Sequence, residues 1–343
     1  MPTEPPSVAP AEDTLPRARA LLAEHPVADG YNELARALRS APWSDIELGE
    51  STLDTDIPRL RAGGVGAQFW SLHTTEGSCA VVASLEQIDH VRAMVAGYPQ
   101  ALRLALSSGE VGHARACGRI ASLLGPADAA AIGDSLGTLR ALYALGVRSL
   151  TLTGAGWAPP TGLTRFGQEV VREMNRLGLL ADLSGAPAET MRAVLTVSRA
   201  PVILSRSGAL ARTGHPGNAP DDVLAALREN GGLCMVPFAA DRTGPELGDV
   251  ADHLDHVRAL AGPGCVGLSG SYDTGDDHQG ALRDTAGYPY LIAELLDRGW
   301  PEAELARLTW GNLQRVLRDV ELTARSAQQR RSPSTARRED LDC

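Results

Sequence analysis

The stretch Ser135–Thr153, SLGTLRALYALGVRSLTLT, decides the fold because it combines a helix, a glycine and a buried strand. Residues Ser135–Leu145 have the apolar spacing of an amphipathic helix, and Gly146 stands where a helix C-cap is expected. Ser149–Thr153 follows as a short apolar β-run. A helix that leads into a further short strand is the repeating unit of parallel α/β folds.

The same alternation extends along the chain. The expected strands are Val27–Asp29, Gly66–Leu72, Ile120–Leu124, Ser149–Thr153, Leu180–Leu183, Val202–Ser205, Leu233–Phe238 and Val266–Gly270. The expected helices between and after them include Glu86–Ala96, Ala101–Leu106, Thr164–Leu177, Ala188–Val197, Pro220–Glu229, Val250–Ala261, Tyr288–Asp297 and Ala303–Glu321. Eight such units predict an α/β (β/α)8 TIM barrel. An open doubly wound sheet is the alternative, and the absence of GxGxxG after the first strand disfavours it.

The 343 residues fit one large barrel domain. We expect a disordered tail over residues 1–16, a single (β/α)8 barrel domain over 17–325, and a second disordered tail over 326–343, which is rich in Arg, Ser and Gln. The N-terminal residues lack an apolar segment, so we expect a cytoplasmic protein with no membrane partner.

Charge and composition exclude several classes of function. A net charge of −10 argues against a nucleic-acid partner. All 32 basic residues are arginine, which excludes a Schiff-base lysine, a phosphate-binding lysine and a carbamylated-lysine metal bridge. This bias is typical of a GC-rich bacterial genome. The five cysteines have no CxxC spacing and fit reduced thiols.

Several blocks in one order resemble the membrane (renal) dipeptidases, zinc enzymes on an amidohydrolase-like barrel. The matching blocks include Asp29–Leu34 (DGYNEL), Gly66–Ser71 (GAQFWS), Gly146–Thr153 (GVRSLTLT), Asp182–Ser184 (DLS), Ser198–Ile203 (SRAPVI), Ala251–His256 (ADHLDH) and Gly311–Asn312. The resemblance covers residues 21–321 and implies a TIM barrel of the metal-dependent hydrolase type. It also implies a dimer whose chemistry depends on two zinc ions at the carboxyl ends of the strands.

The resemblance places the metal site on residues that differ from the family's ligands. A His-x-Asp pair after the first strand is here Tyr31 and Glu33. The bridging glutamate corresponds to Ala127, beside Asp128, and two further histidine ligands correspond to Gly185 and Arg206. The substrate-contacting histidine, the substrate-binding arginine and the catalytic aspartate correspond to Gly154, Gly217 and Ser271, with Asp273 retained nearby. Since a catalytic zinc needs about three protein ligands, we expect no metal and no cofactor here.

Arg206 is the most informative of these replacements. A guanidinium can balance a carboxylate that has lost its metal ions and can bind its two oxygens together. We therefore expect Arg206 to form a salt bridge with Glu33 across the pocket, with Tyr31 filling the volume of a metal-bound histidine. The alternative is that Arg206 points to solvent.

Other titratable groups offer weaker hypotheses. His73 and His278 follow strands, and with Glu33, Asp128 and Asp273 they form a loose set near the expected barrel mouth. We name His73 and Asp273 as weak catalytic candidates. His253 and His256 have helical spacing but belong to a matched structural block. A serine nucleophile at Ser205 or Ser207 is disfavoured because no GxSxG motif is present.

These observations predict a dipeptidase-like pseudoenzyme with a binding or regulatory role. Its pocket, lined by Tyr31, Glu33, Asp128, Gly154, Gly185, Arg206 and Ser271, would take a small anionic or dipeptide-like ligand. The chain would form a homodimer or pair with an active paralogue. The alternatives are an active zinc-dependent dipeptidase and a metal-independent hydrolase that uses the same pocket.

Overall fold

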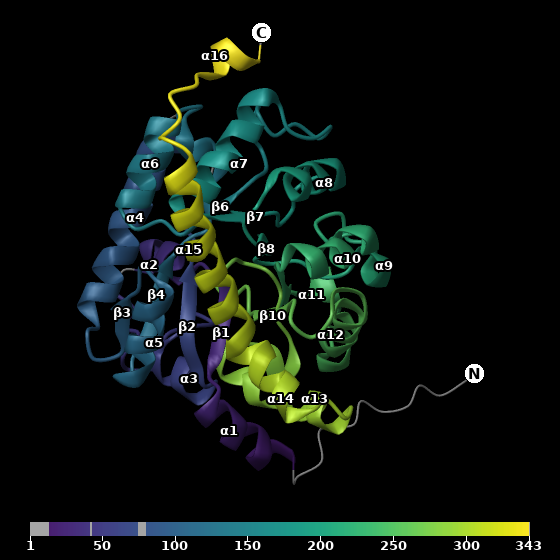
Figure 1. Cartoon of the computed structure of the whole chain (residues 1–343). Helices are drawn as coiled ribbons and strands as arrows, with labels where there is room; N and C mark the ends of the chain where they lie inside the picture. Colours follow the sequence, from purple (N-terminus) through teal and green to yellow (C-terminus); the bar gives the residue numbers. More distant parts are fainter. Residues whose placement is uncertain (1–13, 42, 75–79, 343) are drawn as a thin grey trace.

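The computed structural model describes residues 14–41, 43–74 and 80–342 (Figure 1). The first half contains α1 (Thr14–Glu24), β1 (Val27–Asn32), α2 (Leu34–Ser40), α3 (Ile57–Ala62), β2 (Val65–Trp70), α4 (Ala80–Gly97), β3 (Leu102–Leu104), α5 (Ser108–Ala116), β4 (Ile120–Leu124), β5 (Ala127–Asp128), α6 (Leu136–Ala144), β6 (Ser149–Thr151) and α7 (Arg165–Leu177). The second half contains β7 (Leu180–Asp182), α8 (Ala188–Val197), β8 (Ile203–Leu204), α9 (Leu210–Thr213), α10 (Asp221–Asn230), β9 (Leu233–Pro237), α11 (Ala240–Thr243), α12 (Leu247–Ala261), β10 (Val266–Ser269), α13 (Tyr288–Asp297), α14 (Glu302–Ala306), α15 (Asn312–Arg330) and α16 (Arg338–Leu341).

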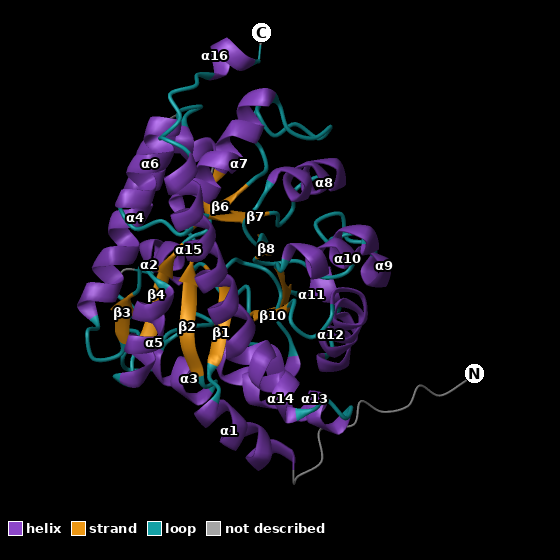
Figure 2. Cartoon of the chain, in the orientation of Figure 1, coloured by secondary structure: helices purple, strands orange, loops and turns teal. Residues whose placement is uncertain are grey.

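All the strands run parallel in one sheet, in the order β3-β4-β2-β1-β10-β9-β8-β7-β6-β5. β5 follows β4 after only two residues, and while β4 pairs with β2, β5 pairs with β6. A bridge between Leu124, the last residue of β4, and Val147, two residues before β6, joins the two sides of this order and leaves β3 outside the ring. The strands therefore close into a ring surrounded by helices (Figure 2), and the predicted (β/α)8 barrel is confirmed. The alternative of an open doubly wound sheet is set aside.

Two apolar clusters hold the barrel. The larger cluster lies between the strands and the outer helices, and the smaller one includes Phe69, Met235 and Ile203 together with Trp310 and Val316 from the last helical segment. Asn312 donates hydrogen bonds to the carbonyl of Val266, the first residue of β10. The segment that leads into α15 therefore packs at the amino ends of the strands, and the carboxyl ends form the opposite mouth.

One predicted helix is wrong. Ala101–Leu106 was expected to be helical, but Leu102–Leu104 forms β3, which pairs with β4 outside the ring. A run of six residues with apolar residues at both helical and alternating spacing does not distinguish the two structures, and here the pairing with β4 decides.

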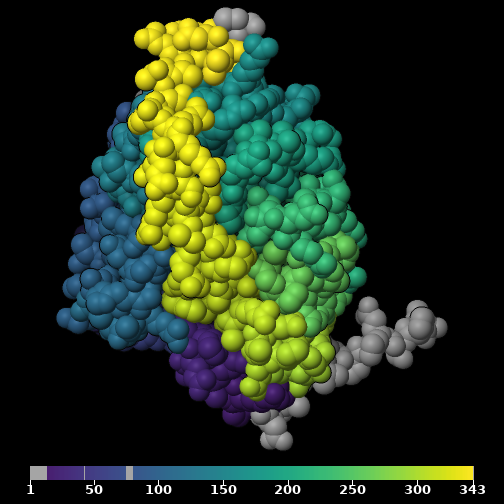
Figure 3. Space-filling model, in the orientation of Figure 1, coloured from purple at the N-terminus to yellow at the C-terminus, as the bar shows by residue number. Residues whose placement is uncertain are grey.

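The C-terminal residues differ from the expected disordered tail. α15 continues to Arg330, and residues 331–342, which we call the C-terminal strap, lie against α6 and α7. The carboxylate of Asp342 accepts hydrogen bonds from the Phe166 amide (2.9 Å) and the Thr164 hydroxyl (2.7 Å) at the start of α7. In Figure 3 the strap and α15 form one band over the surface.

The reason for this difference is a set of ion pairs that composition alone does not reveal. Glu173 of α7 is buried and binds Arg140 and Arg176, and the carbonyl of Ser334 in the strap accepts a second hydrogen bond from Arg140. Arg331 pairs with Glu169. At the other end of the chain, residues 1–13 lie outside the described range and Thr14–Pro16 belong to α1. None of the helices within the described ranges is both long and apolar enough to cross a bilayer.

Candidate functional site

The residues predicted for the site come from the carboxyl ends of different strands. Tyr31 lies near the end of β1, Asp128 ends β5, and Arg206 follows β8 by two residues. Because the carboxyl ends of parallel barrel strands meet at one rim, these side chains lie at the same mouth. The structure brings Tyr31, Glu33, His73, Asp128 and Arg206 together through direct contacts.

Tyr31 is the centre of these contacts. Its hydroxyl donates to Glu33 Oε1 (2.5 Å), accepts from Ser71 Oγ (3.0 Å) and lies 2.9 Å from His73 Nδ1. Burial raises the pKa of Tyr31 well above its ordinary value, while the charge of Arg206 works in the opposite direction. The hydroxyl therefore stays protonated and donates a hydrogen bond to Glu33 Oε1.

The predicted salt bridge between Arg206 and Glu33 is wrong. Arg36, one turn along α2, binds Glu33 through Nε (2.5 Å) and Nη2. Arg206 instead places its guanidinium carbon 4.2 Å from the centre of the Tyr31 ring, in a cation–π contact. Arg206 thus faces the site, as expected, but its partner is the Tyr31 ring, while the two oxygens of Glu33 are bound by Tyr31 and Arg36.

His73 joins two sides of the mouth. Its Nε2 lies 3.0 Å from Thr151 Oγ1 and 3.5 Å from Asp128 Oδ1. Burial lowers the pKa of His73, and the Asp128 carboxylate opposes this effect. The Thr151 hydroxyl donates its single proton to Asp182, so His73 Nε2 donates to Thr151 Oγ1. In a neutral His73 the Nδ1 atom is then an acceptor that competes with Glu33 for the Tyr31 proton. This arrangement suits a proton acceptor or relay.

Asp182, at the end of β7, is the residue that sequence reasoning missed. Its carboxylate accepts from Thr151 Oγ1 (2.9 Å), from the amide and hydroxyl of Ser184 (3.1 and 2.7 Å), and from the amide and hydroxyl of Ser205 (2.9 and 2.7 Å). Ser184 Oγ also accepts from the Arg206 amide (3.0 Å). Asp182 therefore ties the ends of β6, β7 and β8 together. It stood in the matched block Asp-Leu-Ser, but only the fold shows how many donors converge on it.

The serines that follow β8 are structural. Ser205 Oγ is occupied by Asp182, and Ser207 Oγ donates to the carbonyl of Gly208 and accepts from the Ala219 amide. Both are buried, and in the described ranges neither hydrogen-bonds a histidine. The arrangement gives no activated serine nucleophile.

Asp273 lies in a different set of contacts from His73. Its Oδ1 accepts from the Asp54 amide (2.9 Å), and its own amide donates to Asp54 Oδ2 (3.0 Å). Burial, with a smaller contribution from the Asp54 charge, raises the pKa of Asp273 to about 7. Ser271 and Asp273 both have left-handed backbone angles, with φ of 56° and 60°. Asp273 thus clasps the loop after β10 to the segment before α3, and no hydrogen bond or ion pair with His73 exists in the described parts of the chain.

The two glycines predicted to line the pocket leave open space. Gly154 and Gly185 have φ of 77° and 68°, and no atom lies within 4 Å of a Cβ built on either. Ala127 is fully buried in β5, so it presents no ligand. Two of the other histidines have structural partners: His253 Nδ1 accepts from the Ala209 amide, and His278 contacts the Gly270 carbonyl.

The donor groups at the mouth do not fit a zinc pair. Over residues 14–41, 43–74 and 80–342, no group of three or more His, Cys, Asp or Glu side chains is arranged to hold a metal ion. Both oxygens of Glu33 are engaged, by Tyr31 and by Arg36. About three protein ligands are the usual minimum for a catalytic zinc.

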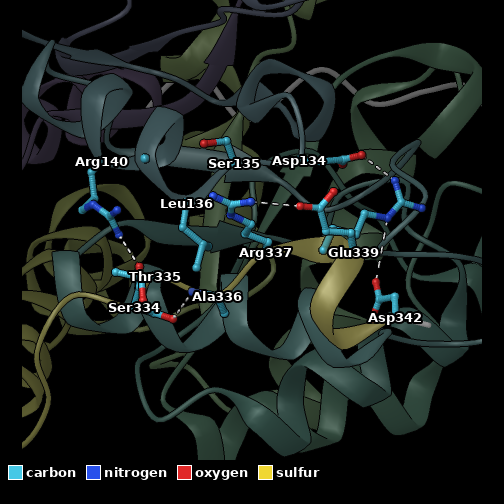
Figure 4. A pocket seen from close by; sticks show the side chains of 12 residues that line it. Asp134, Ser135, Leu136, Arg140, Ser334, Thr335, Ala336, Arg337, Glu339 and Asp342 are labelled. Carbon is cyan, nitrogen blue, oxygen red and sulfur yellow. Dashed lines mark hydrogen bonds and ion pairs between the residues drawn. The ribbon is translucent and has the colours of Figure 1, made fainter.

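A hollow of about 750 Å³ lies between α6 and the C-terminal strap (Figure 4). Its arginines already have partners: Arg140 binds the Ser334 carbonyl, Arg337 binds Glu339, and Arg338 pairs with Asp134 and Asp342. The arginines that line this hollow are therefore already bound by carboxylates or a main-chain carbonyl, unlike Arg206 at the mouth of the barrel.

Comparison with known proteins identifies the family. The model of the membrane dipeptidases, peptidase family M19, matches residues 15–331. The chain belongs to this family. Dipeptidase 3 of Macaca fascicularis is 41% identical over 335 residues, which cover 90% of this chain and 68% of that protein. Dipeptidase 3 of Mus musculus is 40% identical over 331 residues, 89% of this chain and 66% of that protein.

Solved structures of the dipeptidase family have the same fold. A metallopeptidase from Rhodobacter sphaeroides, crystallised with a phosphinate mimic of the dipeptide L-Ala-D-Ala, has a TM-score of 0.77 and 25% identity, with 86% of this chain and 99% of that chain covered. The probable dipeptidase PvdM from Pseudomonas aeruginosa has a TM-score of 0.82 at 18% identity, with coverage of 91% and 99%. The second match supports the fold alone.

Proposed function

We propose that this chain is a non-catalytic member of the membrane dipeptidase family, a pseudoenzyme whose barrel mouth binds a small anionic or dipeptide-like ligand without zinc. Its membership of the family rests on the comparisons above. The loss of catalysis is the inference made here.

One observation carries the proposal. The resemblance puts the first pair of metal ligands at Tyr31 and Glu33, and these two groups are bonded to each other rather than free for a metal. Arg36 binds the other carboxylate oxygen of Glu33. A cation, Arg206, follows β8 and contacts the Tyr31 ring. Bringing a divalent cation to this mouth would require breaking these bonds and placing it near a guanidinium, which Coulomb repulsion opposes.

The test combines metal content with turnover. The purified protein, incubated with Zn²⁺ and then freed of unbound metal, should contain far less than one zinc per chain by mass spectrometry and should not hydrolyse a panel of dipeptides. The Rhodobacter sphaeroides metallopeptidase, treated in the same way, serves as the positive control. Stoichiometric zinc with hydrolysis that a chelator abolishes would overturn the proposal.

A second candidate is a metal-independent hydrolase, and the contacts of His73 favour it. The imidazole connects Tyr31 on one side with Thr151 and Asp182 on the other, a geometry that can move a proton. In this case hydrolysis of some dipeptide or amide would persist in chelator and be lost in His73→Gln. A His278→Gln variant is the control, because His278 contacts main-chain carbonyls instead.

A further inference from the structure

We propose that Arg206 and Arg242 together form a binding site for a compact dianion at the carboxyl ends of β8 and β9. This inference rests on the proposed non-catalytic function, since it replaces metal ions at the mouth by an anion. It adds Arg242, which lies in α11 directly after β9.

The two arginines are neighbours. Arg242 Nη1 donates to the main-chain carbonyl of Arg206 at 3.3 Å. Burial lowers the pKa of Arg242, and the charge of Arg206 lowers it further, while Asp241, Asp276 and Tyr31 act in the opposite direction. The two positive charges are therefore close enough to repel each other at the mouth.

Neither guanidinium has an ion-pair partner among the residues that the structure describes. Within the parts of the chain that the structure describes, no carboxylate oxygen lies within 4.0 Å of a guanidinium nitrogen of Arg206 or Arg242. The Nε of Arg242 is buried and has no hydrogen-bond partner among the same residues. Many other arginines of the chain are paired, including Arg36, Arg140, Arg176 and Arg298. A buried donor without a partner is costly, so an acceptor brought by a ligand would stabilise Arg242 Nε.

The surrounding residues hold both side chains ready. The main-chain amide of Arg206 donates a hydrogen bond to Ser184 Oγ, and its guanidinium packs on the Tyr31 ring. Three hydrogen-bond contacts of the Tyr31 hydroxyl hold that ring in place. Arg242 passes beside Gly217: a Cβ built there would lie 2.9 Å from Arg242 Nη1. Gly185, next in sequence to Ser184, has no atom within 4 Å of a Cβ built on it. The site is thus preorganised, and glycine at position 217 makes room for the second cation.

Charge balance selects a dianion over a monoanion. Two half-buried guanidinium groups with no counter-ion repel each other, and a ligand with two negative charges removes that repulsion. Guanidinium donors match the oxygens of a phosphate or carboxylate. A phosphate ester and a dicarboxylate share this chemistry, so separate ligands must distinguish them.

The experiment is calorimetric titration of the full chain, freed of metal by chelator, at low salt. Inorganic phosphate and succinate are the dianionic probes, and acetate is the monoanionic one. We expect saturable binding of at least one dianion, with acetate weaker by about tenfold or more. Whichever dianion binds more tightly identifies the oxygen geometry that the site prefers.

Three variants test the residues. Arg206→Gln and Arg242→Gln should each weaken dianion binding by about tenfold or more. Gly217→Ala keeps both charges but displaces Arg242, and it should weaken binding in the same direction. Arg283→Gln removes an exposed arginine and should leave binding unchanged, and circular dichroism melts confirm that each variant folds.

The test of the two-arginine site can fail without the pseudoenzyme proposal failing, and the reverse also holds. If no dianion binds to a protein that also lacks zinc and turnover, or if binding is unchanged in both Arg206→Gln and Arg242→Gln, the two-arginine site is wrong while the pseudoenzyme stands. If acetate binds as tightly as the dianions, the inference is also overturned. Zinc-dependent turnover would overturn the pseudoenzyme by itself.

Discussion

The guanidinium of Arg206 rests 4.2 Å above the ring of Tyr31, so the side chain that follows β8 stacks on the side chain near the end of β1. These are two of the positions at which the family resemblance places metal ligands. A cation–π contact joins them across the mouth, where a zinc enzyme of this fold would use metal coordination. The hydroxyl of the same ring binds Glu33, so one aromatic residue satisfies a cation on its face and an anion at its edge.

Replacing Tyr31 by phenylalanine tests the importance of that hydroxyl. The ring and its contact with Arg206 remain, but Glu33, Ser71 and His73 each lose a hydrogen-bond partner. We expect the free energy of unfolding, measured by urea titration, to fall by about 1–3 kcal/mol. Tyr290→Phe is the matched control, because Tyr290 is exposed. Equal stability of the two variants would contradict this account of the mouth.

Asp273→Asn tests the buried carboxyl in the loop after β10. With a pKa of about 7 in the folded protein, this group keeps a proton that the unfolded chain releases near pH 4. Raising the pH from about 4 to 7 therefore lowers its contribution to the free energy of unfolding, by at most about 4 kcal/mol. The stability of Asp273→Asn relative to the wild type should rise over this range and stay constant above it.

The pH dependence is measured by urea titrations at several pH values. The asparagine oxygen can still accept from the Asp54 amide, so the loop keeps its geometry. Asp277→Asn, on the exposed side of the same loop, should show no such trend. A stability difference for Asp273→Asn that is independent of pH would show that the carboxyl is not protonated in the folded state.

Asp342→Ala tests how the C-terminal strap is attached. Asp342 supplies the start of α7 with an acceptor from a residue far away in sequence, and a negative charge there also suits the helix dipole. Loss of such a cap costs about 1 kcal/mol. We expect a lower melting temperature and faster amide exchange at Phe166. Asp340→Ala, at an exposed position in α16, should change neither, and an equal effect of both would argue against a specific cap.

Glu173→Gln tests the buried ion pairs beneath the strap. Burial opposes ionisation of Glu173, but hydrogen bonds from Arg176 and Arg140 outweigh it and lower its pKa. Because Arg140 and Arg176 lose their buried counter-ion in this variant, the free energy of unfolding should fall by about 3 kcal/mol. Trypsin should also cleave faster at Arg331. Glu189→Gln, in an exposed pair with Arg192, should cost at most about 1 kcal/mol. Unchanged cleavage in Glu173→Gln would separate the strap from this cluster.

Much of the fold was predictable because its signals are local. Helical spacing, cap glycines such as Gly146 and short apolar runs gave the order of strands and helices, and that order allows few topologies. The strand at Leu102–Leu104 was missed because its pairing with β4, not its own sequence, decides its structure. The strap was missed because the partners of Arg331 and Asp342 lie more than 150 residues away.

The site was less predictable. Tyr31 and Arg206 were identified from the resemblance, yet the partner of Glu33 was misjudged. The spacing of Glu33 and Arg36, three residues apart at the start of a helix, was a visible signal for that ion pair. No comparable signal exists for Arg242 or Asp182, whose importance comes from strands that meet only in the folded barrel.

The five donors that converge on Asp182 have an evolutionary consequence. They tie three strand ends together with hydrogen bonds that the polypeptide makes to itself, without help from any bound group. Changes of side chain at Gly185 or Arg206 leave these five hydrogen bonds in place. Such a scaffold is evolvable: natural selection can exchange the chemistry of the opening while the architecture that frames it stays constant.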